Sequence, residues 1–234
     1  MPSAQKIEFD ELARGQVEPD LYSLSREIQT SNVSTLNSLH RRGTVLFAEG
    51  EAVRGVYILR TGRATVSISS SEGRVVILRM AQPGEVLGLN SALGHSSYDA
   101  TVTTLAPCRT DFIPRAELLE LMETSDAARR AILKILSAEL TKLTNCTRSL
   151  LLPLTARARL ARLLLELTRE TNGNNSHVPR VDKLFTHEEI AQMICSSRET
   201  VTRSLAGFSR RKLIRITTDS ILITDREALE QMAL

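Results

Sequence analysis

The stretch FTHEEIAQMICSSRETVTRSL, residues 185–205, determines how the rest of the chain can be interpreted. Its second residue is Thr186, and Glu189 follows three residues later, which is the capping-box pattern that starts a helix. After a short polar interruption the same spacing returns at Ser196 and Glu199, so Ser196 is expected to cap a second helix. Two short helices joined by so brief a turn predict a helix-turn-helix motif.

The residues that follow this motif predict a hairpin and a last helix. Two apolar runs, 213–216 and 221–224, are separated by the turn residues Thr218, Asp219 and Ser220. A hairpin in this position is the wing of a winged helix. Thr224 and Glu227 then have the spacing that caps a final helix, near 225–232.

Charge is distributed unevenly along the chain. Residues 155–215 hold 12 Lys and Arg against six Asp and Glu, an excess of six positive charges, whereas the whole chain has a net charge of only +3. A basic third on a slightly acidic remainder predicts a polyanionic partner for that third. A solvated charged surface is the alternative.

The second helix of the motif is expected to expose four side chains that could read base edges in double-stranded DNA: Arg198, Glu199, Thr202 and Arg203. Arginine can donate two hydrogen bonds to guanine, and a carboxylate can accept from the amino group of cytosine. An acid among phosphates weakens non-specific binding, so Glu199 favours sequence reading over simple charge attraction. Its alternative role is to cap the helix through Ser196. Predicted phosphate contacts are Thr186, Ser196, Ser197, Thr200, Arg210, Arg211 and Lys212, although a solvated face explains residues 210–212 equally well.

The N-terminal half predicts an antiparallel β-sandwich or barrel. Short apolar or alternating segments separated by Gly-containing turns occupy residues 36–115, and the clearest are 44–47, 55–59, 64–69, 75–80 and 100–105. Residues 1–34 are polar with weak periodicity, and we expect a loose helix or disorder there.

From residue 116 onward the pattern is helical. Apolar positions alternate steps of three and four along a predicted dimer seam made of Leu133, Leu136, Leu140, Leu143, Thr147 and Leu150. A helix buried against its own domain is the alternative. Pro153 interrupts this helix, and Thr155 is expected to cap the next one, 156–168. The predicted division of the chain is 1–34, 35–124, 125–152 and 153–234.

Several classes of protein are disfavoured by the sequence. No apolar run approaches the roughly 20 residues that span a membrane, and the N-terminus lacks a signal-peptide core, so a cytoplasmic location is predicted. The three cysteines are far apart and show no metal or disulfide spacing. No nucleophile–base–acid set, Walker-type loop or metal triad is present, so an enzyme is not expected. A ligand-binding regulatory module without a DNA function remains an alternative.

From about residue 36 to 230 the chain resembles the superfamily of the cyclic-AMP receptor protein and the fumarate-nitrate regulator (Crp/Fnr), which are bacterial transcription factors. The motifs that carry the resemblance are GTVLFAEGEAVRGVYILRTGRATV, PGEVLGL, LTARARLARLLLELT and, most specifically, FTHEEIAQMICSSRETVTRSL. The resemblance implies an α+β protein with a cyclic-nucleotide-binding-like β-roll (jelly roll), a long dimerisation helix and a C-terminal winged helix-turn-helix.

The resemblance also implies how such a protein works. It would be a homodimer on a near-palindromic operator, in contact with RNA polymerase as an activator is, although operator position decides between activation and repression. The residues RETVTR look like the receptor-protein type, which implies half-sites containing GTGA or TGA. Thr202 partly resembles the regulator type, which has a small hydroxyl residue just before the last arginine.

The segment GEVLGLNSALGHSSYDATV, residues 84–102, departs from the cyclic-AMP pattern. Leu89 stands where that pattern has the ribose-binding Glu, and Tyr98 and Asp99 stand where it has Arg-Ser. An aspartate would repel the phosphate, so cyclic AMP is not expected in the usual mode. A different small effector, or none, remains; the candidate pocket residues are Gly84, Glu85, Leu89, Tyr98, Asp99, Thr144 and Asn145. Turn geometry explains the glycines equally well, and a polar layer that sets coiled-coil register explains Thr144 and Asn145.

Other cofactors of the superfamily are also not expected. An oxygen-sensing iron–sulfur cluster needs four ligands, and no cysteine precedes Cys108. A haem would need an axial ligand such as His95, with Pro2 as a terminal ligand, and a lone loop histidine is usually a surface residue. No metal site is predicted.

Overall fold

The computed structural model describes residues 24, 27, 28, 33–94, 96–151, 155–171, 180–182 and 185–233, without the side chains of 142, 145–151, 169–171, 180 and 182. The chain divides into two units, 1–145 and 146–234, and each is described by itself.

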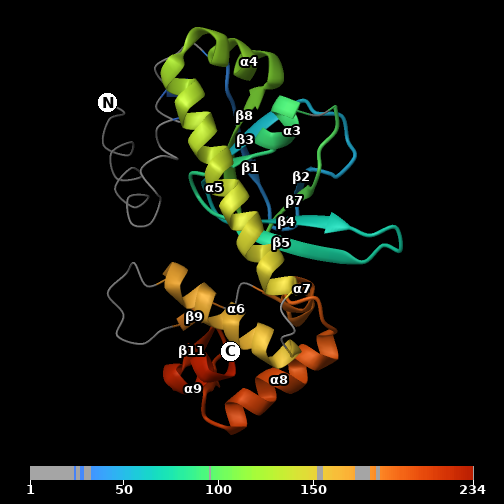
Figure 1. The fold of residues 1–234 in the computed structure, drawn as a ribbon, viewed down its shortest axis with the longest axis vertical. Helices are drawn as coiled ribbons and strands as arrows, with labels where there is room; N and C mark the ends of the chain where they lie inside the picture. The colour runs from blue at the N-terminus through green and yellow to red at the C-terminus, as the bar shows by residue number, and fades with distance from the viewer. Residues whose placement is uncertain are drawn as a thin grey trace. The chain divides into compact units, whose positions relative to one another are not determined.

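The first unit contains two antiparallel four-stranded sheets (Figure 1). One sheet has the order β1 (Leu36–His40), β8 (Cys108–Pro114), β3 (Gly55–Thr61) and β6 (Val86–Leu87). The other has the order β2 (Val45–Phe47), β7 (Thr101–Thr104), β4 (Ala64–Ser69) and β5 (Val75–Ala81). The strand spacing predicted antiparallel sheets of this kind, and the resemblance implied that they form a β-roll.

The five predicted strands correspond to β2, β3, β4, β5 and β7, with ends that agree within two residues. Three further strands, β1, β6 and β8, were not predicted. The side chains of β1 are largely exposed, and its sequence LNSLH has no buried alternation. Its pairing with β8 from Leu36 to His40 makes it a strand, and sequence periodicity cannot show such a partner.

Within residues 33–145, as far as they are described, the first unit has the helices α3 (Leu89–Gly94), α4 (Arg115–Thr124) and the N-terminal part of α5 (Asp126–Leu151). Ala128, Ile132 and Ile135 of α5 are buried in one apolar cluster with residues of β3, β6 and β8. The start of α5 is therefore part of the core of the β-roll. Leu24 and Ile28 are helical, as one of the two expectations for residues 1–34 has it, but both are buried in the same cluster and so are not loose.

The second unit contains the predicted winged helix-turn-helix (Figure 1). Its elements are α6 (Ala156–Thr171), β9 (Arg180–Asp182), α7 (His187–Met193), α8 (Arg198–Arg210), β10 (Ile214–Ile216), β11 (Ser220–Ile223) and α9 (Arg226–Met232). The predicted hairpin β10–β11 gains a third strand, β9, that was not predicted. Helix α6 contacts both α8 and α9. The helices and the sheet share a core that includes Leu160, Leu205 and Phe208.

Two helix starts test the capping predictions. The backbone N–H of Ala158 donates to the hydroxyl of Thr155 at 3.1 Å, which confirms Thr155 as the cap of α6. The predicted cap of α9 is wrong by one residue. Asp225 accepts from the N–H of Ala228, while the Thr224 hydroxyl donates to the carbonyl of Lys212. The predicted break at Pro153 lies outside the described residues.

Candidate nucleic-acid interface

The predicted capping box at the start of α7 is complete. The Glu189 N–H donates to the Thr186 hydroxyl at 3.1 Å, and the Thr186 N–H donates to the Glu189 carboxylate at 2.6 Å. Ile190 and Ala191 are buried, so this helix is held against the rest of the unit by its apolar face. The first helix of the motif is therefore defined by its own sequence.

The turn between α7 and α8 differs from the prediction by one residue. Ser197, rather than Ser196, is the N-cap of α8 and accepts from the N–H of Thr200 at 3.3 Å. The N–H of Ser196 instead donates to the carbonyl of Ala191. Cys195 takes a left-handed conformation, with φ +48°. This turns the chain so that Ser197, and not Ser196, becomes the cap.

A side chain of α6 supports this turn. The guanidinium of Arg159 donates to the carbonyl of Ile194 at 2.7 Å and to that of Cys195 at 3.3 Å. These carbonyls lie at the end of α7, where helical partners run out. The sequence places Arg159 only within the basic segment, and the fold shows that its guanidinium binds the carbonyls of the turn after α7.

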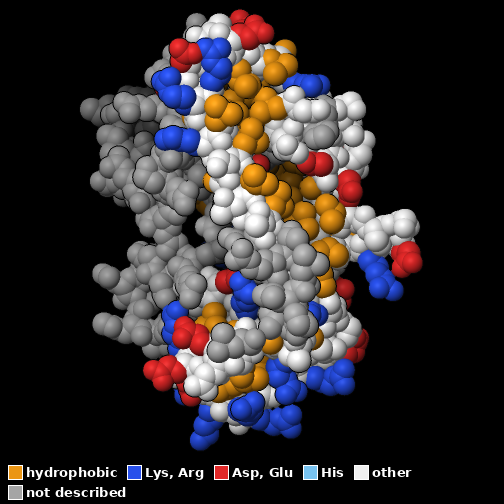
Figure 2. Space-filling view, viewed as in Figure 1, with side chains coloured by type: hydrophobic (Ala, Val, Ile, Leu, Met, Phe, Trp, Pro, Cys, Tyr) orange, Lys and Arg blue, Asp and Glu red, His pale blue; other side chains and the backbone are white. Residues whose placement is uncertain are grey.

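Helix α8 has one buried and one exposed face. Val201, Ser204, Leu205 and Phe208 are buried, as part of the unit's core. The four predicted base-reading residues are all exposed and are called the reading face below: Arg198, Glu199, Thr202 and Arg203. Figure 2 shows Lys and Arg side chains gathered along the lower edge of the molecule, where Figure 1 places α8.

The reading face holds its acid in the ionised form. Hydrogen bonds from the backbone N–H of Glu199 itself and from the Ser197 hydroxyl lower the pKa of the Glu199 carboxyl, and Arg198 and Arg203 lower it further. Ionised carboxylates only accept hydrogen bonds. Glu199 is thus prepared to meet a donor such as the amino group of cytosine.

The predicted phosphate contacts surround the reading face. Thr186, Ser197 and Arg210 are exposed, and Ser196 and Thr200 are half-buried. The two cap hydroxyls already accept backbone bonds in the protein, and the Thr200 hydroxyl lies 3.1 Å from that of Ser197. Arg211 and Lys212 follow the end of the helix and are exposed. Contact with phosphate stays a prediction for all seven.

The effector candidates of the first unit are engaged within the protein. Leu89 and Tyr98 are buried. The Tyr98 ring stacks on Phe47 with centroids 4.0 Å apart, and its hydroxyl donates to the carbonyl of Gly55 at 2.8 Å. At Gly88, with φ +80°, a Cβ would lie 2.9 Å from the Tyr98 ring, so this glycine is required by the tyrosine. Leu89 and Tyr98 therefore have packing roles, and contact with an effector stays a prediction.

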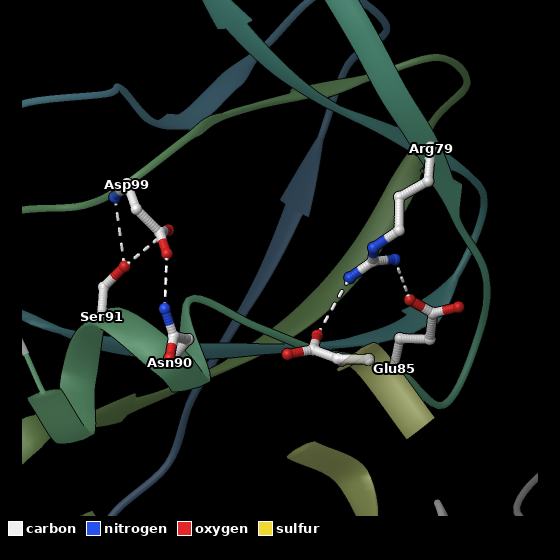
Figure 3. Close-up of polar contacts among 6 residues, drawn as sticks. Arg79, Glu85, Asn90, Ser91 and Asp99 are labelled. Atoms are coloured by element: carbon white, nitrogen blue, oxygen red, sulfur yellow. Dashed lines mark hydrogen bonds and ion pairs between the residues drawn. The ribbon is translucent and has the colours of Figure 1, made fainter. Parts of the chain in front are cut away.

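Asp99 is hydrogen-bonded to the polar side chains near the start of α3. Its carboxylate accepts from the Asn90 amide and from the Ser91 hydroxyl, both at 2.7 Å (Figure 3). The Asp99 N–H also donates to the Ser91 hydroxyl at 3.1 Å. A phosphate approaching these groups would meet a carboxylate already in place, and the expectation that cyclic AMP does not bind in the usual mode stays a prediction.

A three-residue ion network joins the β-roll to α5. Arg79 of β5 pairs with Glu85 (Figure 3) and also with Glu139 of α5, the latter at 3.0 Å. The side chains are only 17%, 10% and 22% exposed, respectively. Glu139 lies three residues beyond Leu136, the last α5 residue in the apolar cluster. Sequence reasoning named Glu85 as an effector contact and missed Arg79 and Glu139, because no spacing links the three.

The structure describes the side chains of four of the six residues in the predicted dimer seam. Leu133, Leu140 and Leu143 are 66%, 66% and 44% exposed, so these three are not used by the core of their own unit. Leu136 packs against that core, and its place in the dimer seam stays a prediction. Thr144 is exposed and its hydroxyl donates to the carbonyl of Leu140 at 2.9 Å. The side chains of Asn145, Thr147 and Leu150, and residue His95, lie outside the described part.

Two further findings concern the described residues. Within that part of the chain, no three His, Cys, Asp or Glu side chains are grouped so that they could hold a metal ion. Likewise, none of the helices described is both long and apolar enough to span a membrane.

Known proteins match both units. Residues 39–125 match the family model of the cyclic nucleotide-binding domain, and residues 158–232 match that of the Crp-like helix-turn-helix domain. The CRP-like cAMP-activated global transcriptional regulator of Mycobacterium tuberculosis is 30% identical over 192 residues, 82% of this chain and 85% of that protein.

Solved structures show the same fold. FixK2 from Bradyrhizobium japonicum superposes with a TM-score of 0.74 at 20% identity, covering 86% of this chain and 98% of that one. The c-di-GMP-responsive global regulator CLP of Xanthomonas campestris gives a TM-score of 0.72 at 20% identity, with the same coverage. These features define a transcriptional regulator that combines an effector-binding type of domain with a DNA-binding helix-turn-helix, and not an enzyme. The chain belongs to the Crp/Fnr family.

Proposed function

We propose that this regulator binds an inverted-repeat operator as a homodimer and reads each half-site with the reading face of α8. The observation that carries the proposal is the state of that face: two arginines flank an ionised Glu199 on a capped helix whose opposite side is buried. Arginine and carboxylate together provide donors for guanine and an acceptor for cytosine. Half-sites containing GTGA or TGA are expected.

Selection of binding sites from random duplex DNA, with no added ligand and at stated salt, tests this proposal. We expect an inverted repeat to be enriched. If none is enriched, the selection is repeated with cell extract, and failure there as well would contradict sequence-specific binding.

Single variants then separate base reading from charge attraction. Arg203→Ala should relax the preference at one guanine and cost about 1–3 kcal/mol of binding free energy. Arg74→Ala is the matched control, because it removes the same charge from an exposed turn of the β-roll. Arg210→Ala should weaken binding to all sequences and reduce the salt slope by about one. Equal losses for Arg203→Ala and Arg74→Ala would contradict the assignment of the reading face.

The homodimer is supported by the exposed leucines of α5. A charge at Leu140 would have to be buried in the seam, which is costly for an unpaired carboxylate. We expect the wild-type protein to sediment as a dimer and Leu140→Asp as a folded monomer. Thr141→Asp places the same charge at the neighbouring exposed position and should remain dimeric. If Leu140→Asp also stays dimeric, the seam lies elsewhere.

A small effector other than cyclic AMP is proposed for the β-roll, since Asp99 occupies the groups that would meet a phosphate. The relatives' names describe one protein as cAMP-activated and another as c-di-GMP-responsive, so effectors differ among proteins of this fold. As a DNA-binding regulator the protein would act in the cytoplasm and contact RNA polymerase, as an activator where the operator position permits.

A ligand-independent regulator is the second candidate. The network of Arg79, Glu85 and Glu139 joins the β-roll to α5 with protein groups alone, which favours it. Enrichment of an operator without ligand would support this candidate, and enrichment only with cell extract would support an effector.

A further inference from the structure

One contact joins the two helices of the motif beside the reading face. Nδ1 of His187, the first residue of α7, lies 2.9 Å from the hydroxyl oxygen of Thr202 in α8. The same hydroxyl donates to the carbonyl of Arg198, one turn earlier in α8, at 2.9 Å. Among the residues described, Thr202 is therefore the one member of the reading face whose side chain hydrogen-bonds to α7.

Together the two bonds determine which group is the donor in each. A hydroxyl has a single proton, and the Arg198 carbonyl can only accept. Both bonds form together only when the Thr202 proton points to Arg198 and His187 donates through Nδ1–H. The imidazole tautomer is then set by this contact. The Thr202 hydroxyl has no proton left for an acceptor on a base edge.

Because the hydroxyl is engaged within the protein, the γ-methyl group is the part of this exposed side chain that can contact DNA. The 5-methyl group of thymine is the apolar feature of the major groove, and the threonine methyl is a side-chain group that contacts it. Two bonds at fixed directions also hold the χ1 angle of Thr202, so the methyl is held in one direction rather than free to rotate.

On this basis, and resting on the proposed function, we propose that Thr202 reads a thymine by methyl–methyl contact and that His187 is the positioning residue that holds it. This assigns to His187 a role in specificity that its position in α7 does not suggest. It also narrows the base-reading role of Thr202 to one base, thymine, which is contacted by one group, the γ-methyl.

The DNA test removes only the thymine methyl. Each thymine of the operator obtained by selection is replaced in turn by deoxyuridine. We expect one position per half-site to lose about fourfold in affinity, as burial of one methyl group gives. Thr202→Ser keeps the hydroxyl and its two hydrogen bonds but lacks the methyl, so it should lose this discrimination.

The role of His187 is tested in the same assay. His187→Phe keeps a ring but has no donor, so the thymine-to-deoxyuridine ratio should fall. His187→Asn places an amide N–H near the position of Nδ1–H and should restore it. Undiminished discrimination by Thr202→Ser overturns the reading by Thr202, and undiminished discrimination by His187→Phe overturns the positioning role.

Two readouts separate this inference from the proposed function. A tightly bound operator in which no deoxyuridine has an effect overturns the inference alone, while failure to select any operator counts against the proposed function. Nitrogen-15 NMR of the free protein needs no DNA. Among the four histidines, the signal lost in His187→Asn should report a proton at Nδ1 when the spectrum is recorded well above the ordinary histidine pKa. Protonation at Nε2 instead would overturn the inference without reference to any operator.

Discussion

Cys195 bears the backbone strain of the turn between α7 and α8. Its φ of +48° is left-handed, a conformation that costs a residue with a Cβ about 1–2 kcal/mol. The residue is exposed, so its side chain contributes little packing that could offset this cost. The turn is formed nonetheless because the two capped helices and the Arg159 contacts determine where the chain must pass.

Cys195→Gly should therefore stabilise the second unit. Glycine relieves the strain but loses more entropy on folding, which leaves a net gain of about 0.5–1 kcal/mol. Hydrogen exchange of the buried α8 amides at Leu205 and Phe208 should slow by a few-fold. Cys195→Ala keeps the Cβ and is the control, for which no gain is expected. Faster exchange in Cys195→Gly would show that the turn is not strained.

Ser197 has two roles, as the cap of α8 and as a hydrogen-bond donor to Glu199. Ser197→Gly retains an acceptable N-cap residue but removes the hydroxyl, so the pKa of Glu199 should rise toward its ordinary value. A lowered carboxyl pKa stabilises the fold above the unfolded-state pKa, and the contribution is lost as pH falls through the folded value. In Ser197→Gly this acid-labile contribution should shrink.

An NMR titration of the Glu199 carboxyl carbon in both proteins measures the change. Ser209→Gly, which removes an exposed hydroxyl from the last turn of the same helix, is the control. An identical Glu199 titration in the wild-type protein and Ser197→Gly would contradict the role of the hydroxyl.

At the scale of elements, the attachment of α5 to the β-roll changes character along the helix. Its first turns are held by apolar packing through Ala128, Ile132 and Ile135, and farther along Glu139 is held by Arg79. The two carboxylates share one guanidinium. If the arginine is removed, both acids lose their partner and repel each other.

Arg79→Met should lower the free energy of unfolding of the first unit by about 3 kcal/mol, since it breaks a largely buried ion network. The added changes Glu85→Gln and Glu139→Gln remove the uncompensated charges and should recover most of the loss. All three tyrosines lie in residues 1–145 and the chain has no Trp, so tyrosine fluorescence in urea reports on this unit.

Arg74→Met removes a charge from the exposed β4–β5 turn and should leave the urea midpoint unchanged. If Arg79→Met is equally neutral, the network has no energetic weight. If the triple variant is no better than the single one, the loss reflects packing of the arginine stem rather than charge.

At the scale of the whole molecule, a domain that matches the cyclic nucleotide-binding model carries Asp99, which we expect to oppose the phosphate of a cyclic nucleotide. Its conformation is maintained by internal contacts of Tyr98, Asp99 and Arg79. A ligand present at 100 times its Kd adds about 2.7 kcal/mol to stability, which would raise the Tm by several degrees.

Cyclic AMP at about 1 mM, which would add several kcal/mol if its Kd were in the micromolar range, should therefore leave the melting curve of the wild-type protein unchanged, since Asp99 opposes the phosphate. Asp99→Asn keeps the size of the side chain but removes the charge, so any weak affinity should appear there first. A clear rise in Tm for the wild-type protein would show that the nucleotide binds in a way that avoids Asp99.

The sequence by itself determined the elements whose signals are local. The capping box of α7, the Thr155 cap, the five alternating strands and the exposed arginines and acid of α8 all follow from spacing within a few residues. The resemblance in FTHEEIAQMICSSRETVTRSL placed these elements in the Crp/Fnr family, and comparison confirmed it.

The tertiary structure alone decided features that depend on partners distant in sequence. The polar strands β1 and β9 exist because β8 and β11 pair with them. The cap moved from Ser196 to Ser197 because the left-handed Cys195 and the carbonyl contacts of Arg159 set the turn. The network of Arg79 and the bond between His187 and Thr202 likewise join separate elements, and no periodicity within either element encodes such a contact.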